Sequence, residues 1–269
     1  MNYAVRLAAH LVSEVSSRVR FVLRCIMAGK YARMRWVFDD TARPLLDLLM
    51  SVDPENFETI VDGGANHGVF SRAFLRISPN AQVIGIEPMV ALAEGNRGSK
   101  AARACLRDLN RLRDRYPGRF RILGLALSDR EETRRFFITQ ADGCSSLLQP
   151  PDVFLESFEV MSEDLVTTTT LDKLVEAEQI GTIDLLKLDL QGAEMLALRG
   201  AEKALGNTKN VLLELNLRRV YKDSATTNEI TEFLAERGFR FAKISNVTTP
   251  PDGSIAQCDA FFTRAAQPK

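Results

Sequence analysis

From residue 58 onward, short apolar runs alternate with segments that have the spacing of amphipathic helices. The runs are TIVDGG, QVIGIEP, FRILGLALSD, IDLLKLDLQG, NVLLELN, GFRFAKIS and CDAFFTRA. The helical segments cover residues 70–77, 88–115, 193–205 and 226–236. Nearly continuous apolar strands that alternate with helices are typical of a parallel sheet with helices on both faces. The pattern therefore predicts an α/β fold built on such a sheet.

Two further runs, TRRFFIT and LVTTTTL, predict added strands that frame a loop over residues 139–163. The loop combines a glycine, two serines and the pair Pro150-Pro151, a composition suited to a lid over an active site. The last two apolar runs lie on either side of the turn-rich segment NVTTPPDGS. They predict an antiparallel hairpin at the edge of the sheet.

Residues 1–50 predict a helical extension that precedes a main domain over residues 51–269. Apolar residues recur there at three-to-four spacing and form one face: Ala4, Ala8, Leu11, Val15, Val19, Val22 and Ile26. Through residue 38 the segment contains seven Lys or Arg residues and one Glu. Such a segment is typical of a helix packed on the domain with a solvated basic face. The alternative is a surface helix that contacts an anionic membrane or another partner.

The composition excludes some classes of protein. The chain has 269 residues, 45% of them hydrophobic, and a formal net charge of zero, which argues against nucleic acid as the main partner. Its four cysteines are far apart and show no metal-ligand spacing, so we expect reduced thiols. No apolar run approaches the ~18 residues of a membrane span, and the N-terminus lacks the pattern of a secretory signal. We therefore expect a cytoplasmic protein.

The segment VDGGANHG, residues 61–68, holds three glycines between a predicted strand and a predicted helix. This places the turn at the carboxyl edge of the sheet, where open α/β folds bind ligands. Glycines let a ligand approach the main chain, so Gly64→Val is expected to intrude on the ligand's space. The spacing is not G-x-G-x-x-G, and Asp62 would repel a pyrophosphate, which argues against a nicotinamide dinucleotide.

Glu87 ends the second strand and can accept hydrogen bonds from both hydroxyl groups of a ribose. An acid before the turn and an acid on the ribose favour S-adenosylmethionine as the ligand. A tight turn without a ligand is the alternative.

Several motifs, in order along the chain, resemble those of the FkbM family of S-adenosylmethionine-dependent methyltransferases. DGGANHG (62–68) fits D-x-G-A-N-x-G, and Glu87-Pro88 matches the end of the family's second strand. The segments ALSD, SSL, TLDKL, RGAEKAL and LLELN follow where the family expects them. The most specific match is KLDLQGAE (187–194), similar to K-x-D-x-E-G-A-E. Gln191 departs from the Glu that is frequent in the family and is therefore a poor candidate for an essential base.

The resemblance covers roughly residues 55 to 245 and implies the class I methyltransferase (Rossmann-like) fold. That fold has seven strands, six parallel and one antiparallel. The implied reaction is methyl transfer from S-adenosylmethionine, most often to a hydroxyl oxygen. The implied cofactor-binding residues are Asp62, Gly63, Gly64, Asn66, Gly68, Glu87, Pro88, Ala126, Ser128 and Asp189.

Polar residues at the ends of two neighbouring strands are candidates for the chemistry. Lys187 and Asp189 are two apart and share a face of their strand, as do Glu214 and Asn216 on the next. We predict that Asp189, Lys187, Glu214 and Glu194 are catalytic, with Asp189 and Lys187 as the main acid–base pair. A purely structural ion pair is the alternative for these two residues.

Two other roles are weighed at the same place. The oxygen atoms of Asp189, Glu214 and Asn216 would suit a divalent metal, but a hydrogen-bonded polar network is favoured and no metal is predicted. His67, inside the glycine turn, is interpreted as a solvent-directed or packed side chain rather than a base.

The predicted function is O-methylation of a hydroxyl group on a small molecule or carbohydrate. A non-catalytic module that binds S-adenosylmethionine is one alternative, and a nicotinamide-dependent oxidoreductase is another. A homodimer and a peripheral contact of the basic N-terminal helix with a membrane are left open.

Overall fold

The structure is a computed structural model, and it describes residues 17–23, 25, 27, 29–30, 42–94, 99–150, 158–218, 220–248 and 257–265. The chain divides into two compact units, Met1–Pro54 and Glu55–Lys269. The helix expected before residue 17 lies outside the described residues, as does the central part of the loop expected to form a lid, residues 151–157.

Within the first unit, residues 17–23 are helical and α2 (Ala42–Leu48) follows later in the chain. The Arg43 guanidinium donates a hydrogen bond to Ser17 Oγ at 2.8 Å, which links the two helices. Phe21 is buried, whereas Val19 and Leu23 are about half exposed, at 53% and 52%. The first helix thus has one face toward its own unit and one apolar face that is open.

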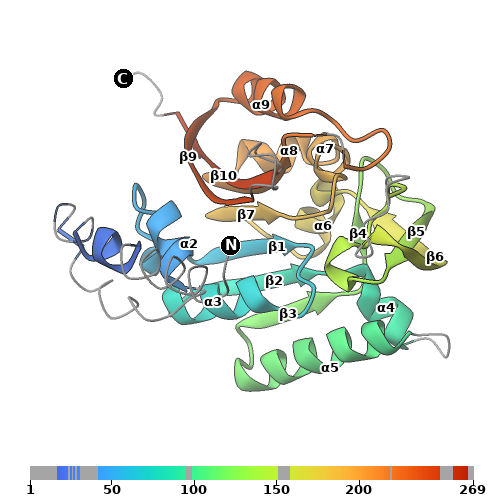
Figure 1. The fold of residues 1–269 in the computed structure, drawn as a ribbon. Coiled ribbons are helices and arrows are strands. Elements are labelled where there is room, and N and C mark those ends of the chain that lie inside the picture. Colours follow the sequence, from blue (N-terminus) through green and yellow to red (C-terminus); the bar gives the residue numbers. More distant parts are fainter. Residues whose placement is uncertain are drawn as a thin grey trace, which may run out of the picture. The chain divides into compact units, whose positions relative to one another are not determined.

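The second unit is built on a seven-stranded sheet in the order β3-β2-β1-β7-β8-β10-β9 (Figure 1). Neighbouring strands are parallel from β3 to β8, β10 is antiparallel to β8, and β9 is antiparallel to β10. Six strands therefore run in one direction and one runs against them, as predicted. The strands are β1 (Thr59–Gly63), β2 (Gln82–Ile86), β3 (Phe120–Leu123), β7 (Leu185–Leu188), β8 (Asn210–Asn216), β9 (Phe239–Thr248) and β10 (Gln257–Arg264).

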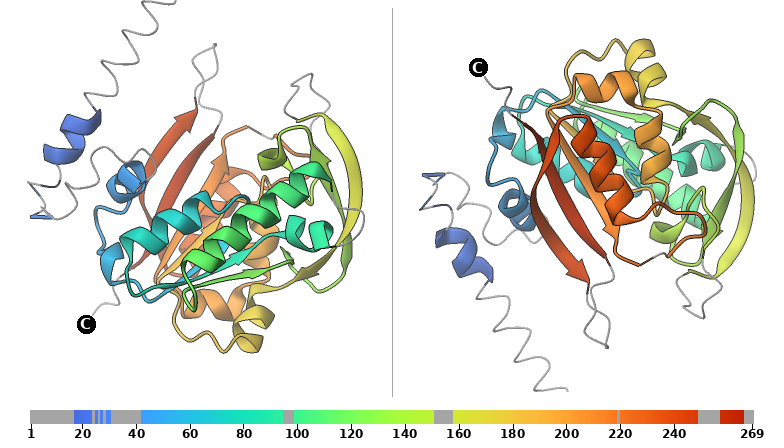
Figure 2. Two further views of the ribbon diagram at one scale, coloured as in Figure 1. Left: turned by 90° about the horizontal axis from the view of Figure 1, so that it is seen from below. Right: turned by 90° about the horizontal axis from the view of Figure 1, so that it is seen from above.

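Helices cover both faces of this sheet. Seen from opposite sides, α3 and α5 lie in front of one face, and α7 and α9 in front of the other (Figure 2). Helices α7, α8 and α9 share one core with the strands. Their residues Leu198, Leu205 and Leu234 are almost fully buried in it. The bounds are η2 (Pro54–Asn56), α3 (Val69–Ile77), α4 (Pro88–Glu94), α5 (Lys100–Arg115), α6 (Leu171–Ala177), α7 (Glu194–Arg199), α8 (Glu202–Gly206) and α9 (Thr227–Glu236).

The helical segment predicted over residues 88–115 is divided into two helices, since α4 ends at Glu94 and α5 begins at Lys100. Ser99 caps α5 by accepting a hydrogen bond from the Ala102 amide at 3.0 Å, which gives the second helix its own start. The segment 193–205 also forms two helices. They meet at Gly200, where an added Cβ would lie 2.1 Å from the Ser128 carbonyl oxygen.

The run FRILGLALSD does not form one strand either. It gives β3 in the main sheet and β4 (Ala126–Leu127) in a second sheet of order β4-β6-β5. The added strands are confirmed as β5 (Thr133–Thr139) and β6 (Val160–Thr169), which pair antiparallel. A short 3-10 helix, η3 (Asp142–Cys144), follows β5.

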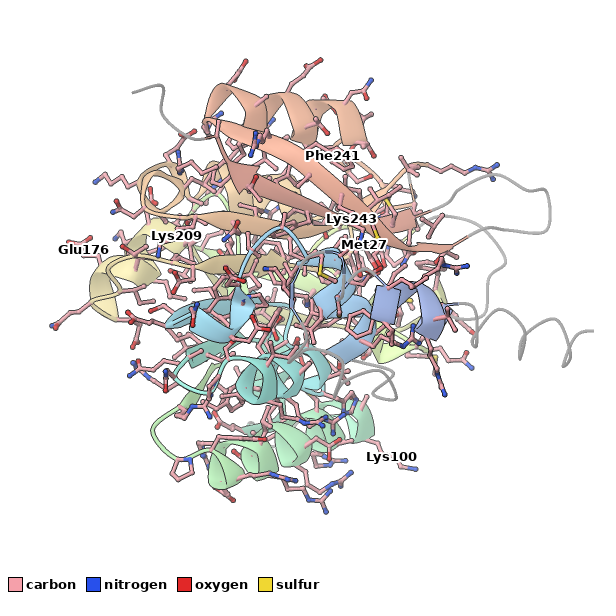
Figure 3. All side chains as sticks on the ribbon, turned by 90° about the vertical axis from the view of Figure 1, so that its left-hand side faces the viewer. Met27, Lys100, Glu176, Lys209, Phe241 and Lys243 are labelled. Carbon is pink, nitrogen blue, oxygen red and sulfur yellow. The ribbon has the colours of Figure 1, made fainter. Side chains whose placement is uncertain are left out.

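The closing hairpin is confirmed at the edge of the main sheet. Strand β9 is the outermost strand and pairs only with β10 in the order of the sheet. Phe241 and Lys243 lie along it (Figure 3), and the Phe241 side chain is 53% exposed.

Candidate active site

The glycine turn after β1 is a compact left-handed segment. Gly64, Asn66 and Gly68 have φ values of 72°, 44° and 73°, a region that glycine tolerates and asparagine adopts more readily than most residues. A Cβ added to Gly64 would lie 1.9 Å from the Asp189 carbonyl oxygen. A side chain at position 64 would therefore strain the turn by meeting the chain itself, and Gly64 also lines the cavity described below, so that intrusion on the ligand's space stays a prediction.

Glu87 lies at the end of β2 and its carboxylate faces the same turn. Its Oε2 accepts a hydrogen bond from the Asn66 amide at 2.9 Å, and its Oε1 accepts one from the Met89 amide at 3.0 Å. Burial raises the pKa of Glu87, although the two amides oppose this by stabilising the charged form. Each oxygen keeps a further lone pair for a hydroxyl donor.

Asp62 and Lys187 form a buried ion pair, which we call the sealed pair. Lys187 Nζ lies 3.0 Å from Asp62 Oδ1, and the two side chains are 4% and 0% exposed. Ser71 donates to the other oxygen of Asp62 at 2.6 Å, and Lys187 donates to the Gly64 carbonyl at 3.2 Å. Burial opposes the charge on Lys187, but the carboxylates of Asp62 and Asp189 outweigh it and raise the pKa of the lysine.

A second group of polar side chains, the open network, consists of Asp189, Gln191, Glu214 and Tyr221. Gln191 Nε2 donates to Asp189 Oδ1 and to Glu214 Oε2, both at 2.8 Å. The Tyr221 hydroxyl lies 2.9 Å from Gln191 Oε1. Asp189 Oδ2 is 3.6 Å from Lys187 Nζ, and its side chain is 27% exposed. The favoured hydrogen-bonded network thus exists at this strand edge.

Acids predominate around the open network, and their pKa values are shifted accordingly. Burial and the nearby carboxylates of Asp189, Glu194 and Asp259 raise the pKa of Glu214 to about 9. Burial, opposed by a hydrogen bond from Asn246, raises the pKa of Asp259 to about 6. Protons are therefore held near this edge of the sheet at neutral pH.

Glu194 faces the turn before α7 rather than the open side of the network. Its Oε1 accepts hydrogen bonds from the amides of Leu190 and Gly192, at 2.7 and 3.3 Å, and the residue is 2% exposed. Burial raises the pKa of Glu194 to about 7, against the effect of these amides. This position fixes the backbone that carries Asp189 and Gln191.

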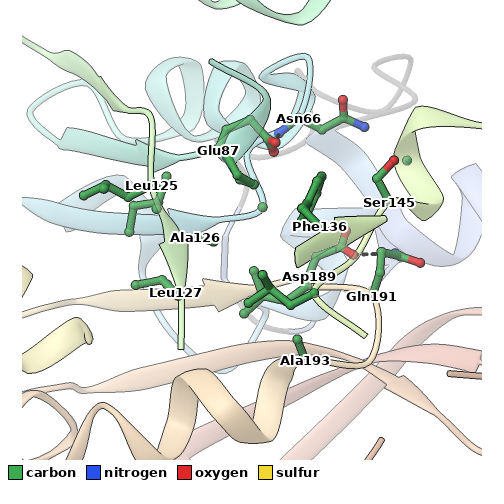
Figure 4. Close-up of a pocket in the computed structure, with 16 residues that line it drawn as sticks. Asn66, Glu87, Leu125, Ala126, Leu127, Phe136, Ser145, Asp189, Gln191 and Ala193 are labelled. Atoms are coloured by element: carbon green, nitrogen blue, oxygen red, sulfur yellow. Dashed lines mark hydrogen bonds between the residues drawn. The ribbon is translucent and has the colours of Figure 1, made fainter. Parts of the chain in front are cut away.

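A cavity of about 580 Å³, counted with the solvent at its mouth, lies between the glycine turn and β4. Glu87 and Asn66 lie at one end, and Asp189 and Gln191 at another, with Phe136 between them (Figure 4). The lining residues are Gly64, Asn66, Ile86, Glu87, Pro88, Leu125, Ala126, Leu127, Phe136, Gly143, Ser145, Leu147, Asp189, Leu190, Gln191 and Ala193.

Six of the residues predicted to bind the cofactor line this cavity: Gly64, Asn66, Glu87, Pro88, Ala126 and Asp189. The other four, Asp62, Gly63, Gly68 and Ser128, do not. Ser128 is fully buried, its amide donates to the Thr169 carbonyl, and its hydroxyl contacts Asp129 and Arg134. Asp62 forms an ion pair with Lys187 instead, and Gly68 caps the start of α3 in the left-handed conformation.

The remaining candidates lie apart from the cavity. His67 Nδ1 is 2.8 Å from Asp108 Oδ2 of α5, and this hydrogen bond lowers the pKa of Asp108. Asn216 accepts a hydrogen bond from Thr227 through its carbonyl oxygen at 3.1 Å. Of the described residues, none form a group of three or more His, Cys, Asp or Glu side chains arranged to hold a metal ion.

Sequence reasoning missed Tyr221 and the apolar lining of the cavity. Nothing local in the sequence distinguishes Phe136 or Leu125 from ordinary core residues. The SSL motif (145–147) was a usable signal, since Ser146 donates a hydrogen bond to the Gln191 carbonyl at 2.8 Å. This bond links the segment after η3 to the open network.

Part of the predicted lid borders the cavity. Gly143, Ser145 and Leu147 line it, and Tyr221 contacts the same loop at Cys144 and at Phe158. The tyrosine hydroxyl lies 2.8 Å from the Cys144 carbonyl, and its ring contacts the Phe158 ring edge-on at 5.8 Å between centroids. Opening and closing of this loop stays a prediction.

In the part of the chain that the structure describes, no helix is both long and apolar enough to span a membrane. Cytoplasmic residence stays a prediction.

One reversed strand in a seven-stranded sheet, and a glycine turn that faces an acid at the end of the second strand, define the class I methyltransferase fold. The chain belongs to the methyltransferase FkbM domain family, whose model matches residues 62–241. It is accordingly a methyltransferase, and its cofactor is S-adenosylmethionine.

Two characterised proteins are similar in sequence. The 2-O-methyltransferase NoeI of Sinorhizobium fredii (strain NBRC 101917 / NGR234) is 27% identical over 201 residues, which cover 71% of this chain and 75% of NoeI. The AMB antimetabolite synthetase AmbE of Pseudomonas aeruginosa is 28% identical over 227 residues, 78% of this chain but 10% of AmbE.

Among solved structures, a methyltransferase FkbM from Methylobacillus flagellatus KT aligns with a TM-score of 0.47 and 15% identity. The alignment covers 94% of this chain and 60% of that one. The family membership does not depend on this similarity.

Proposed function

We propose that the protein transfers a methyl group from S-adenosylmethionine to a hydroxyl oxygen of a small molecule or carbohydrate. The observation that carries the proposal is the position of Asp189. It is the partly exposed carboxylate in the same cavity as Glu87, and it is held by Gln191 and Lys187. The similarity to a 2-O-methyltransferase supports oxygen as the acceptor atom.

The residues present fit the cofactor. Glu87 offers two carboxylate oxygens, and Asn66 and Gly64 line the cavity beside it. Leu125, Leu127 and the other apolar lining residues suit the adenine, while the acidic end suits the cationic methionine part. When bound, S-adenosylmethionine supplies an electrophilic methyl group on a sulfonium.

The chain's own residues then do three things. The cavity walls exclude water and hold the acceptor hydroxyl in line, which can supply much of the rate. Asp189 accepts the proton of that hydroxyl as the oxygen becomes a nucleophile. Lys187 stays charged and orients Asp189, and Glu194 fixes the turn from which Gln191 extends. Because Glu214 already holds a proton at neutral pH, the proton taken up by Asp189 leaves to solvent, to which the Asp189 side chain is partly exposed.

The test is transfer of label from methyl-labelled S-adenosylmethionine to a fractionated cell extract, with the product identified afterwards. Asp189→Asn keeps the shape of the side chain and removes its charge, so turnover should fall at least ~100-fold, the low end for acid–base catalysis. Its affinity for S-adenosylmethionine, measured by calorimetry, should fall much less than its turnover, because Glu87 is untouched.

Two outcomes would contradict this proposal. Full activity in a stably folded Asp189→Asn protein would remove the assignment of the base and move it to Glu214. Tight binding of S-adenosylmethionine with no labelled product in any fraction would favour a non-catalytic binding module.

We also propose that the N-terminal helix contacts an anionic membrane surface. Val19, Leu23 and Met27 are 53%, 52% and 86% exposed at four-residue spacing, on a segment rich in Arg. Co-sedimentation with vesicles containing phosphatidylglycerol, and its loss in Leu23→Glu, tests the contact. If the mass measured by light scattering is that of a dimer and Leu23→Glu makes it a monomer, a homodimer covers this face instead.

A further inference from the structure

Gln191 has a defined orientation at the centre of the open network. Its amide nitrogen has two protons, and these go to Asp189 Oδ1 and Glu214 Oε2 at 2.8 Å each. Its amide oxygen accepts from the Tyr221 hydroxyl. Glu214 also accepts a hydrogen bond from Gln257, and the single proton of the Tyr221 hydroxyl is shared between Gln191 and the Cys144 carbonyl. Asp189 depends most on this orientation, because turning the amide over would replace its donor by an oxygen.

The acids around Gln191 lie in one row across the sheet. Strand β7 pairs Leu188 with Leu213 of β8, so Asp189 and Glu214 follow next in register, and β10 pairs Asp259 directly with Glu214. Asp189 interacts electrostatically with groups from four elements and a loop: Lys187 (β7), Glu194 (α7), Glu214 (β8), Asp259 (β10) and Tyr221 (the loop after β8). Among these groups only Lys187 is a cation, and it already neutralises Asp62.

A carboxylate at position 191 would add one more negative charge to this row. Like charges at hydrogen-bond distance disfavour ionisation of both groups. Glutamine has nearly the same size but contributes two donors and no charge. A Glu at position 191 would therefore alter the electrostatics at Asp189 with little change in the space that the side chain fills.

We propose that Gln191 is a positioning residue that keeps Asp189 ionised and directed at the cavity, and thereby sets the lower pH limit of methyl transfer. The inference rests on the proposed function, in which Asp189 takes the proton of the acceptor. Gln191 takes no proton itself and acts through Asp189.

The test is the dependence of turnover on pH in Gln191→Glu, from about pH 5 to about pH 9, with methyl-labelled S-adenosylmethionine and the labelled extract fraction. The acidic limb of the profile should move upward by about one pH unit or more, because a neighbouring charge raises a carboxyl pKa by that order. Turnover on the upper plateau is recorded in the same series, so that a shift of the acidic limb is separated from a loss of rate at every pH. Gln191→Met, which removes both donors without adding charge, should move the limb in the same direction by less.

Tyr221→Phe is the matched control, because it removes a contact of Gln191 but leaves both bonds to the carboxyl groups. It should lower the free energy of unfolding and leave the acidic limb where it is. An unmoved limb in both Gln191 variants overturns the proposal, and so does an equal shift in Tyr221→Phe, which would indicate packing alone.

Failure of the inference is distinguishable from failure of the proposed function. If Asp189→Asn is inactive and Gln191→Glu keeps the parent profile, only the role of Gln191 is lost. If Asp189→Asn is fully active, the assignment of the base is wrong, and Gln191 loses its role with it. Calorimetric binding of S-adenosylmethionine shows that each variant is folded.

Discussion

Lys187 lies in β7 and Asp189 directly follows the end of that strand, two residues later, yet they belong to groups with opposite properties. The sealed pair is fully buried, and one lysine matches one aspartate. The open network is partly exposed and contains two acids, Asp189 and Glu214, but no cation of its own. Burial raises the pKa of Glu214 to about 9. Depth along the strand, rather than residue type, separates a charge that holds the fold from a charge that is available for chemistry.

Breaking the sealed pair should have the largest effect on stability. Lys187→Met leaves the Asp62 carboxylate buried without its cation, which costs about 3–5 kcal/mol of unfolding free energy. Urea unfolding measures this. Lys209→Met is the control: its ammonium lies 2.7 Å from Asp184 but its side chain is 61% exposed (Figure 3). Asp184 also keeps the amides of Glu58 and Thr59, so this loss should stay below about 1 kcal/mol. Equal losses in the two variants would contradict the distinction by depth.

Glu87→Ala should reduce binding of the cofactor and also lower stability, because the amides of Asn66 and Met89 lose their acceptor. It removes the acceptor for two ribose hydroxyl groups and lowers affinity for S-adenosylmethionine by about 1.5–3 kcal/mol. Calorimetry measures the change. Glu94→Ala, at an exposed position of the same helix region, should bind as the parent does. Unchanged affinity in Glu87→Ala would refute the ribose assignment.

Glu194 should make the protein less stable as pH rises. Its pKa is about 7 in the folded protein and near the ordinary 4.5 when unfolded, so folding takes up a proton between these values. Stability from this group is therefore present at low pH and lost as pH rises through 7. Glu194→Gln should reduce the slope of unfolding free energy against pH by up to about 1.4 kcal/mol per unit, the value for one proton.

Glu202→Gln is the control of opposite sign for Glu194. The hydrogen bond from Arg237 lowers the pKa of Glu202, so its contribution to stability is lost as pH falls rather than as it rises. If Glu194→Gln leaves the slope between about pH 5 and pH 7 unchanged, the Glu194 carboxyl group is ionised throughout that range and its pKa is not raised by burial.

The smallest effect is expected at Ser146, which links the segment after η3 to the open network. Ser146→Ala removes the hydrogen bond to the Gln191 carbonyl and should cost about 1 kcal/mol of unfolding free energy. Turnover should fall as well, because this carbonyl belongs to the residue that orients Asp189. Thr208→Ala loses a comparable buried hydrogen bond, to Ala204, and should lower stability alone. Similar turnover losses in both variants would contradict a specific link.

The sequence predicted the main sheet, the reversed strand and the turn, because most of the central strands are apolar runs that end on polar residues. It also placed Asp189, Glu214 and Glu87 at that edge. It could not predict that Lys187 pairs more closely with Asp62 than with Asp189, since the two partners are far apart in the chain. Nor could it show that Glu194 faces backbone amides, or that Tyr221 reaches Gln191, because such contacts depend on how loops return over the sheet.

The contacts of Tyr221 with Cys144 and Phe158 have a consequence for evolution and engineering. One aromatic residue thus joins the end of η3 to the residue that leads into β6, on either side of residues 145–157. The entropy of closing a loop rises only with the logarithm of its length. We therefore expect insertions or deletions within residues 151–157 to cost little stability, because both contacts of Tyr221 stay in place.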